Sequence, residues 1–311
     1  MFGGHILFKK KIILIIAIFI LFSGTFVFSK NYFSVSKKSV AEASEINSSN
    51  KAKPEIDKNT TVELNNNDKS NADNEITNPE INKDAKPVKQ VEDRPLYNKE
   101  VFLTLDDGPS NHTEKVLNIL NENNVKATFF IVGKMAEEYP NMLKAIRDNG
   151  MSIQNHSYTH DYSMYQSVEK TNADFSKCDE VIKSIIGKDT SPFIRFPGGS
   201  DNGVSKKEVM AEIRKNYVDK GRHYIDWNIS STDGSPNLVP TDKIIQTVDS
   251  TSAGRKFIVI LMHDANAKTT TVEALPSIIK FLKNQGYTFR TFDDLTPTEL
   301  NEMLKEKIAD R

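Results

Sequence analysis

Short apolar runs alternate with longer amphipathic stretches from Tyr97 onward. Runs rich in β-branched and aromatic residues are typical of buried strands, and apolar residues three or four positions apart are typical of helices. Strands that alternate with helices form a parallel sheet, so the pattern predicts an α/β fold. The expected strands are Val101–Leu105, Ala127–Val132, Met151–Asn155, Phe193–Phe196, His223–Trp227, Phe257–Met262 and Tyr287–Thr291.

Helical patterns fill the segments between these strands. Their expected ranges are Thr113–Asn123, Tyr139–Asn149, Val168–Gly187, Lys206–Lys215, Asp242–Ser252 and Val272–Asn284. This number of strand–helix units favours a barrel that lacks one unit of the common eightfold form over an open sheet.

The N-terminal apolar stretch Ile12–Phe28 follows three lysines and is closed by Lys30. Its length is at the short limit for a membrane span and also suits the core of a signal peptide. The nearest small-x-small sequence ends at Ala43, which is far from the apolar core. We therefore expect residues 1–30 to be a retained membrane anchor with its N-terminus inside; cleavage and secretion is the alternative.

No aromatic residue occurs between Phe33 and Tyr97, where Asn, Lys, Glu and Ser dominate. Such a composition buries too little apolar surface to offset the entropy lost on ordering, so residues 31–96 are predicted to be a disordered linker. A small separate domain is the alternative. We expect residues 97–295 to form the α/β domain and residues 296–311 a C-terminal helical tail.

Composition limits the partners and covalent links of the chain. The formal net charge is −1, and no basic cluster with interleaved aromatic residues is present, which argues against nucleic acid as a partner. Cys178 is the only cysteine, so an internal disulfide is excluded. We expect the protein to act as a monomer.

Polar clusters follow five of the expected strands directly. They are DDGP after the first strand, HSYTH after the third, RFPGGS after the fourth, DWN ending the fifth and MHD ending the sixth. Because the C-terminal strand ends of a barrel open onto one face, these clusters are predicted to form one site. Taken alone, DDGP is also typical of an Asx-type turn that leads into a helix N-cap at Ser110.

His156 and His160 stand four residues apart, a spacing at which two imidazoles can reach one metal. Histidines at this spacing are also common on surfaces. Together with Asp107 they make a set of two histidines and one carboxylate, which suits zinc or non-haem iron. Zinc is favoured because Asp106 and His263, the other groups expected nearby, are typical of hydrolysis.

The remaining polar residues have roles in such a hydrolysis. Asp106 is a candidate general base, and Arg195 offers a permanent cation that would keep a carboxylate ionised. His263 is a candidate general acid, and Asp226 could hydrogen-bond its other ring nitrogen. Trp227 offers a flat apolar wall for a sugar ring, although a tryptophan at a strand end is as often part of the core.

The five clusters, in this order, resemble the motifs of the polysaccharide deacetylase family, the NodB homology domain of carbohydrate esterase family 4. Over roughly residues 97 to 295, LDDGPS corresponds to T-F-D-D-G-P, HSYTH to H-[ST]-x-x-H, RFPGG to R-x-P-x-G, IDW to the D-W motif and LMH to L-x-H. The resemblance implies an irregular (β/α)7 barrel. It also implies roles for individual residues: base Asp106, metal ligands Asp107, His156 and His160, base-orienting Arg195, acid His263 paired with Asp226, and substrate contacts from Pro197, Gly198, Trp227 and Leu261.

Three positions depart from the family pattern. Gly198 stands where many members have Tyr, but glycine retains the backbone N–H that the family uses as an oxyanion donor. His223 stands where Asp is frequent, so a substrate contact made there would differ. Leu105 replaces a common Phe and is expected to be neutral.

The resemblance and the predicted anchor together imply a cell-surface enzyme that acts on peptidoglycan. The expected reaction is removal of the acetyl group from N-acetylglucosamine with Zn²⁺ or another divalent metal such as Co²⁺. Alternatives are deacetylation of chitin, poly-N-acetylglucosamine or acetylxylan, and a catalytically silent carbohydrate-binding protein. The joint presence of Asp106, Arg195 and His263 argues against the silent protein, because binding alone does not require them.

Overall fold

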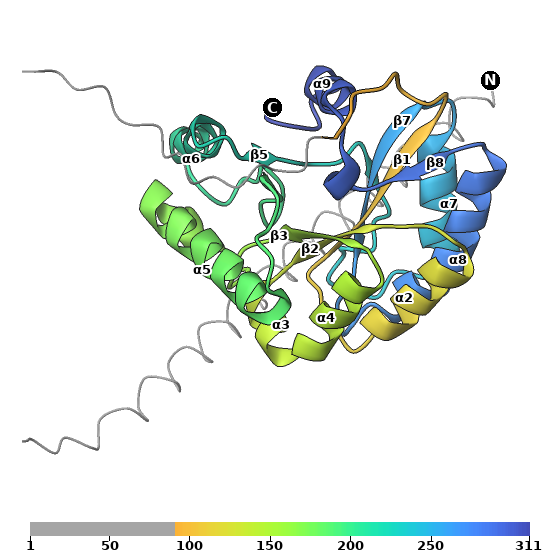
Figure 1. Cartoon of the computed structure of the whole chain (residues 1–311), viewed down its shortest axis with the longest axis horizontal. Coiled ribbons are helices and arrows are strands. Elements are labelled where there is room, and N and C mark those ends of the chain that lie inside the picture. Colours follow the sequence, from red (N-terminus) through yellow and green to blue (C-terminus); the bar gives the residue numbers. More distant parts are fainter. Residues whose placement is uncertain (1–90) are drawn as a thin grey trace, which may run out of the picture. The chain divides into compact units, whose positions relative to one another are not determined.

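A parallel sheet of eight strands forms the centre of the computed structural model, which describes residues 91–311 (Figure 1). The strands follow the order β5-β4-β3-β2-β1-β7-β6, and β8 pairs with β1. Their bounds are β1 (Glu100–Asp106), β2 (Thr128–Ile131), β3 (Ser152–Asn155), β4 (Phe193–Ile194), β5 (His223–Tyr224), β6 (Ile229–Ser230), β7 (Phe257–His263) and β8 (Thr288–Arg290). The sheet curls toward a barrel, and no ladder within residues 91–311 joins its edge strands β5 and β6.

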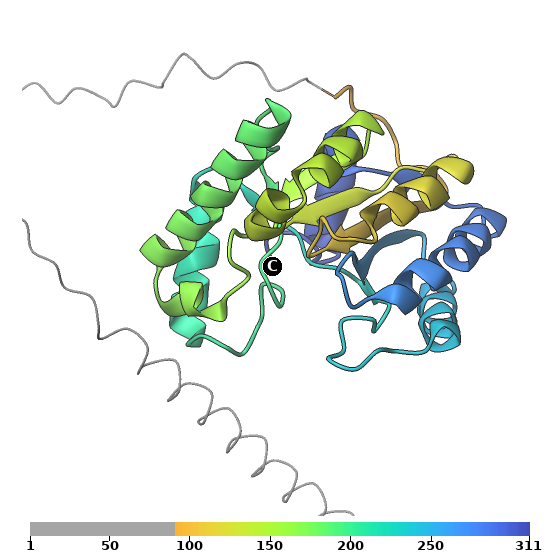
Figure 2. The same ribbon diagram turned by 90° about the horizontal axis from the view of Figure 1, so that it is seen from below.

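Helices cover the outer side of the curled sheet, with α5 and α6 beside one edge and α7 and α8 beside the other (Figures 1 and 2). Apolar side chains from the helices and from the outer face of the strands form the largest hydrophobic cluster. The helix bounds are α2 (Thr113–Glu122), α3 (Gly133–Glu138), α4 (Pro140–Asp148), α5 (Val168–Ile186), α6 (Lys207–Asp219), α7 (Thr241–Ser252), α8 (Thr269–Asn284) and α9 (Pro297–Lys305), with 3-10 helices η1 (Tyr162–Gln166) and η2 (Phe292–Asp294).

The predicted alternation of strands and helices is confirmed, but the region around β5 differs from the prediction. The expected strand His223–Trp227 is only two residues long, His223–Tyr224, and the chain then turns into a second short strand, β6, that the sequence did not predict. β6 pairs with β7 through Ile229 and Ser230 only. A two-residue strand has no hydrophobic period, which explains why the sequence pattern missed it.

Side chains alternate between the two faces of each strand, and this alternation sorts the site residues from the core. On β1, Val101, Leu103 and Leu105 join the outer cluster, whereas Phe102 lies in a second cluster on the inner face. Asp106 therefore points to the inner side, like Phe102. The same period places His263 on the inner side of β7, together with Val259 of the inner cluster.

The C-terminal segment packs against the sheet. A capping box between Thr296 and Glu299 begins α9. Met303 and the following Ile308 are fully or almost fully buried in the inner cluster. An isolated antiparallel bridge joins Ile225 to Ala309, so the end of the described chain lies beside β5.

The predicted membrane anchor, residues 1–30, and the linker up to residue 90 lie outside the described residues. None of the helices in residues 91–311 is long and apolar enough to cross a membrane.

Candidate active site

Two consecutive carboxylates end β1 and face the same site. Asp106 is the last strand residue and is almost fully buried, and Asp107 adopts a left-handed backbone with φ of 73°. This conformation ends the strand, so the side-chain alternation no longer applies to Asp107. The following Gly108 is held close to Asp264, because a Cβ at Gly108 would lie 2.7 Å from Asp264 Oδ2.

Asp264 fixes the turn that carries the two carboxylates. Its backbone N–H donates to Asp106 O at 2.8 Å. Its carboxylate accepts hydrogen bonds from Ser110 Oγ and Thr113 Oγ1, each at 2.6 Å. Burial raises the pKa of Asp264 above its usual value, although the hydrogen bonds from the two hydroxyls act in the opposite direction. The DDGP sequence is therefore a turn tied to the strand end of β7 as well as a lead into α2.

Asp107, His156 and His160 come together as predicted from the sequence. Their ligand atoms all lie within 4.8 Å of one another. Asp107 Oδ1 is 3.3 Å from His160 Nε2 and 3.6 Å from His156 Nε2. His160 also has a left-handed backbone, φ 54°, and its N–H donates to Ser157 Oγ at 3.0 Å, so the loop between the histidines is a tight turn rather than a helix.

These three residues fit a divalent metal on the evidence of their own chemistry. Asp107 Oδ1 is buried and has no hydrogen-bond partner among the described residues. His156 Nδ1 lies 2.8 Å from Arg195 O, which fixes the proton on Nδ1 and leaves the Nε2 lone pair facing Asp107. Burial lowers the pKa of His156 to about 4, against the nearby charge of Asp106, so the imidazole is neutral, as a ligand must be.

Arg195 holds Asp106 from the neighbouring side of the site. Its Nη1 donates to Asp106 Oδ1 at 2.8 Å and to Thr104 Oγ1 at 2.6 Å. The side chain is completely buried, and its guanidinium also donates to Ile225 O and Asp226 O. A guanidinium with this many fixed acceptors cannot swing away, so Asp106 has one orientation, with Oδ2 3.6 Å from His156 Nε2.

His263 ends β7 and is paired with Asp233. His263 Nδ1 lies 2.7 Å from Asp233 Oδ1, and the His263 backbone N–H donates to Asp233 Oδ2 at 2.8 Å. Ser231 Oγ and Thr271 Oγ1 donate to the same carboxylate, at 2.7 and 2.9 Å. Burial lowers the pKa of His263, but the hydrogen bond and charge of Asp233 outweigh it and raise the pKa to about 9.

The sequence had assigned the partner of His263 to Asp226, and the structure differs. Asp226 accepts hydrogen bonds from Ser200, at 2.9 Å from the N–H and 2.5 Å from Oγ, and lies 2.8 Å from Arg311 Nε. Asp226 lies beyond the end of β5, and its carboxylate is taken up by the Ser200 N–H and hydroxyl and by Arg311 instead of His263.

Asp233, the residue that pairs with His263, is not among the site residues predicted from the sequence. It lies three residues beyond β6, in the segment Ser231–Gly234, and β6 is the neighbour of β7. Asp226 was chosen because Asp226 and Trp227 match the D-W motif. In the sequence, Asp233 is marked only as a single acidic residue in a Ser/Thr-rich stretch before α7. That position indicates a site residue only once β6 is recognised as a strand.

The predicted substrate contacts lie around these groups. Leu261 is on the inner side of β7, two residues before His263. Trp227 is half-buried, with its ring 5.7 Å from the Arg195 guanidinium. Pro197 O accepts from Tyr165 Oη at 2.9 Å, and the next residue, Gly198, is exposed with φ of 77°.

His223, a departure from the family pattern, begins β5, stacks on Phe193 at 5.8 Å and lies 2.5 Å from Asp310 Oδ2. Among the described residues its side-chain partners are therefore Phe193 and Asp310, and not Asp106, His263 or the candidate metal ligands.

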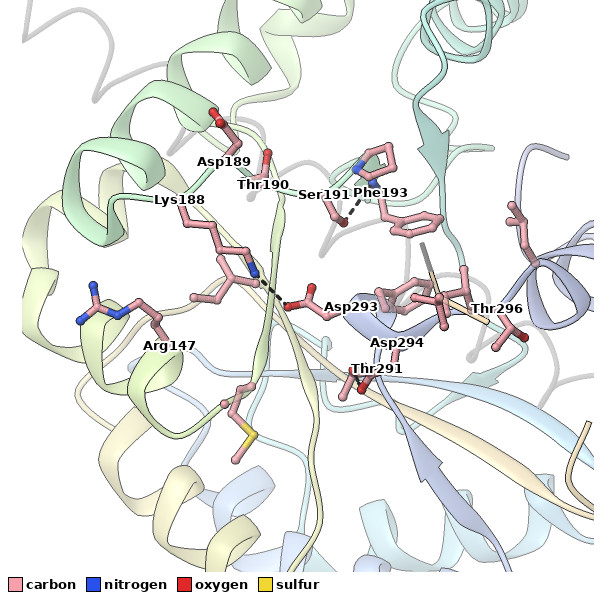
Figure 3. A pocket seen from close by; sticks show the side chains of 18 of the residues that line it. Arg147, Lys188, Asp189, Thr190, Ser191, Phe193, Thr291, Asp293, Asp294 and Thr296 are labelled. Carbon is pink, nitrogen blue, oxygen red and sulfur yellow. Dashed lines mark hydrogen bonds and ion pairs between the residues drawn. The ribbon is translucent and has the colours of Figure 1, made fainter. Parts of the chain in front are cut away.

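A large hollow lies between the start of β4 and the segment after β8 (Figure 3). Its volume is about 1010 Å³, and Phe193, Phe292 and Leu295 contribute apolar surface to it. Lys188 and Asp293 form an ion pair of 3.4 Å at its side. None of the candidate catalytic or metal-binding residues lines this hollow.

Comparison with known proteins gives matches over most of the described residues. The family model described as polysaccharide deacetylase matches residues 93–217. A peptidoglycan-N-acetylglucosamine deacetylase of Bacillus cereus is 35% identical over 201 residues, 63% of this chain and 70% of that protein. A bifunctional xylanase/deacetylase of Pseudobutyrivibrio xylanivorans is 34% identical over 199 residues, 63% of this chain and 30% of that protein.

Solved structures give a similar result. The catalytic domain of peptidoglycan N-acetylglucosamine deacetylase from Eubacterium rectale matches with a TM-score of 0.61 and 34% sequence identity. The match covers 68% of this chain and 96% of that domain.

Proposed function

Because the chain belongs to the polysaccharide deacetylase family, we propose that it removes acetyl groups from N-acetylglucosamine residues of cell-wall peptidoglycan by metal-dependent hydrolysis. The observation that carries this proposal is the joint arrangement of three groups of residues. Asp107, His156 and His160 converge on one point, and beside them lie a carboxylate held by an arginine and a histidine held by a carboxylate.

Asp107, His156 and His160 would hold the metal, and zinc is our first choice because the donors are two imidazoles and one carboxylate. When bound, such an ion supplies Lewis-acid chemistry: it polarises the acetyl carbonyl and acidifies a water molecule. Cobalt suits the same donors. The hydrogen bond from His156 Nδ1 to Arg195 O holds one imidazole in the tautomer that this role needs.

Asp106 is the general base in this proposal. It takes a proton from the attacking water through the carboxylate oxygen that Arg195 does not occupy, and that oxygen faces the metal ligands. Arg195 keeps Asp106 ionised and oriented. Asp106 thus serves as base while its neighbour Asp107 serves as ligand.

His263 is the general acid. Asp233 accepts the Nδ1 proton of His263, so Nε2 of the imidazolium is the atom that gives its proton to the leaving nitrogen. The amide bond then breaks to give acetate and a free amine. We also propose that the backbone N–H of Gly198 donates to the oxyanion, as the family resemblance implies, since no hydrogen bond within residues 91–311 occupies it.

The choice of peptidoglycan rests on relatives that carry that activity in their names, including the Bacillus cereus protein and the Eubacterium rectale domain. Deacetylation of a different polymer is the second candidate, supported by the similarity to the xylanase/deacetylase. A silent binding protein is disfavoured because the base, the acid and their orienting partners are all present.

Acetate release decides between these candidates. The full chain is incubated with peptidoglycan, chitin oligomers, poly-N-acetylglucosamine and acetylxylan, with and without chelator, and acetate is measured. We expect release from peptidoglycan that stops with chelator and returns with Zn²⁺ or Co²⁺. Preferential release from acetylxylan would reject the substrate assignment, and release unaffected by exhaustive chelation would reject the metal.

We further propose that the protein acts at the extracellular face of the membrane, held by residues 1–30. The support is the sequence alone, with lysines before the apolar stretch and a long polar segment after it. Fractionation of cells that express the full chain should recover it with membranes. A mature protein that begins at Ser44 would show that the segment is a cleaved signal peptide.

A further inference from the structure

Tyr162 is an exposed aromatic residue beside the candidate metal ligands. It begins η1, two residues after His160, and 41% of its surface is exposed. The ring centroids of Tyr162 and His160 are 6.0 Å apart. The Asp161 side chain accepts from Ser163 N–H at 2.8 Å and fixes the start of this helix, so the position of Tyr162 is set by the same turn that presents His160.

One face of the Tyr162 ring is supported by the protein. Tyr165 stacks on it with ring centroids 6.2 Å apart and an interplanar angle of 23°. Tyr165 is itself almost fully buried, and its hydroxyl donates to Pro197 O at 2.9 Å. The ring of Tyr162 thus rests on a fixed support and cannot collapse into the core.

Tyr162 also occupies the space in front of Gly198. A Cβ at Gly198 would lie 3.1 Å from Tyr162 Oη and 3.3 Å from its Cε1. The Tyr162 ring comes from η1 and reaches the Pro197–Gly199 loop from the side of the candidate metal ligands.

The hydroxyl of Tyr162 makes no hydrogen bond within residues 91–311, in contrast to the hydroxyl of Tyr165. Its ring has His160 and Tyr165 as neighbours yet stays 41% exposed. An exposed, supported ring beside the candidate metal ligands offers an apolar surface of the kind on which the C–H face of a pyranose ring packs.

We propose that Tyr162 is a specificity-determining residue that stacks on a sugar ring of the bound glycan beside Gly198. This inference rests on the proposed function for the class of ligand, a polymer of N-acetylated sugars. Stacking on an aromatic ring adds binding energy without touching the reacting atoms, so loss of the ring weakens binding and leaves the chemical step intact.

The test measures binding separately from turnover. Tyr162→Ala and Tyr162→Phe are compared in an Asp106→Asn background, where the bound glycan is not consumed, by titration calorimetry with N-acetylglucosamine oligomers. The matched control is Tyr97→Ala, a tyrosine of similar exposure, 46%, in the segment before β1. We expect Tyr162→Ala to weaken binding about fivefold to tenfold and Tyr162→Phe and Tyr97→Ala to leave it within twofold.

Each outcome separates this inference from the proposed function. Glycan binding that depends on Tyr162 in a protein that releases no acetate would keep the inference and reject the deacetylase. Acetate release by the wild-type chain combined with unchanged binding by Tyr162→Ala would keep the deacetylase and reject the inference. Loss of bound zinc in Tyr162→Ala would show that the ring supports His160 instead, and binding of no oligomer by any variant would also overturn the inference.

Discussion

Asp106 and His263 are register partners at the ends of the neighbouring parallel strands β1 and β7. Their backbones are therefore one strand spacing apart, about 4.8 Å, and both side chains point to the inner side of the curled sheet. The β1–β7 ladder, which has seven residue pairs and is the longest in the described part of the chain, fixes the relative position of the proposed base and acid. Their position does not depend on loops. Changes in the loops can alter the substrate while this pair remains in place.

Replacing Asp233 with Asn should move the alkaline limb of the pH–rate profile to lower pH. His263 has a pKa raised to about 9, so it carries its proton below that pH and loses it as the pH rises through about 9. Without the Asp233 charge, burial dominates and the imidazolium is lost at lower pH. The profile of kcat/KM with excess zinc measures the shift.

Asp226→Asn is the control for this prediction, because Asp226 is bonded to Ser200 and Arg311 and not to His263. Its alkaline limb should match that of the wild type. If the alkaline limb shifted as far in Asp226→Asn as in Asp233→Asn, the pairing with Asp233 would not be what sets the pKa of His263.

His156→Ala should remove the bound metal and, with it, activity. The variant loses one of three donors and leaves Asp107 Oδ1 with a single histidine neighbour, His160. Mutating a residue that only hydrogen-bonds a metal ligand already lowers metal affinity about 10 to 100-fold, and loss of a ligand itself should lower it more. Metal per chain after dialysis measures the effect, with His112→Ala, a histidine outside the cluster, as control.

Asp106→Asn should retain metal yet turn over very slowly. General base catalysis contributes on the order of 100 to 10,000-fold, and the amide cannot accept the proton of the attacking water. Metal content and kcat are measured on the same sample. Parallel loss of both would make Asp106 a ligand and exchange the roles of the two carboxylates.

Arg195→Met, which keeps an unbranched apolar stem but removes the guanidinium, should destabilise the protein. Asp106 would remain buried without its partner, and breaking a buried ion pair in this way costs about 3–5 kcal/mol of unfolding free energy. Urea denaturation of Arg195→Met and of the double variant with Asp106→Asn measures the coupling. If the double variant is no more stable than Arg195→Met, the cost comes from lost packing on Phe130 and not from the unpaired carboxylate.

Much of the site was predictable because its residues follow strands with a strong pattern. Val101–Leu105 and Phe257–Met262 are continuous apolar runs, and their ends carry Asp106 and His263. HSYTH contributes two candidate ligands from one tight turn, so the spacing in sequence was sufficient to associate His156 with His160.

The partner of His263 was not predictable from local pattern. Asp233 reaches the site only because β6 adds to β7 through two residues, and such a short ladder leaves no periodic signal in the sequence. Asp226 looked equivalent in sequence, and only the side-chain contacts separate the two: Asp226 is bound by Ser200 and Arg311, whereas Asp233 is bound to His263. The proposed role of Tyr162 required the structure, since nothing in the sequence indicates that its ring reaches Gly198.

The position of β1 in the sheet has a consequence for how the chain folds. It is the first strand of the described chain, yet it pairs with β7 along its whole length and with β8 at its start, and these strands begin at Phe257 and Thr288. Contacts so far apart in sequence require closure of long loops and form slowly. As the chain emerges N-terminal end first, Val101–Leu105 can pair with β2 but must wait for residues after 257 on its other edge. Asp106 and His263 are consequently expected to meet late in folding, and a polypeptide released before residue 263 lacks the proposed general acid.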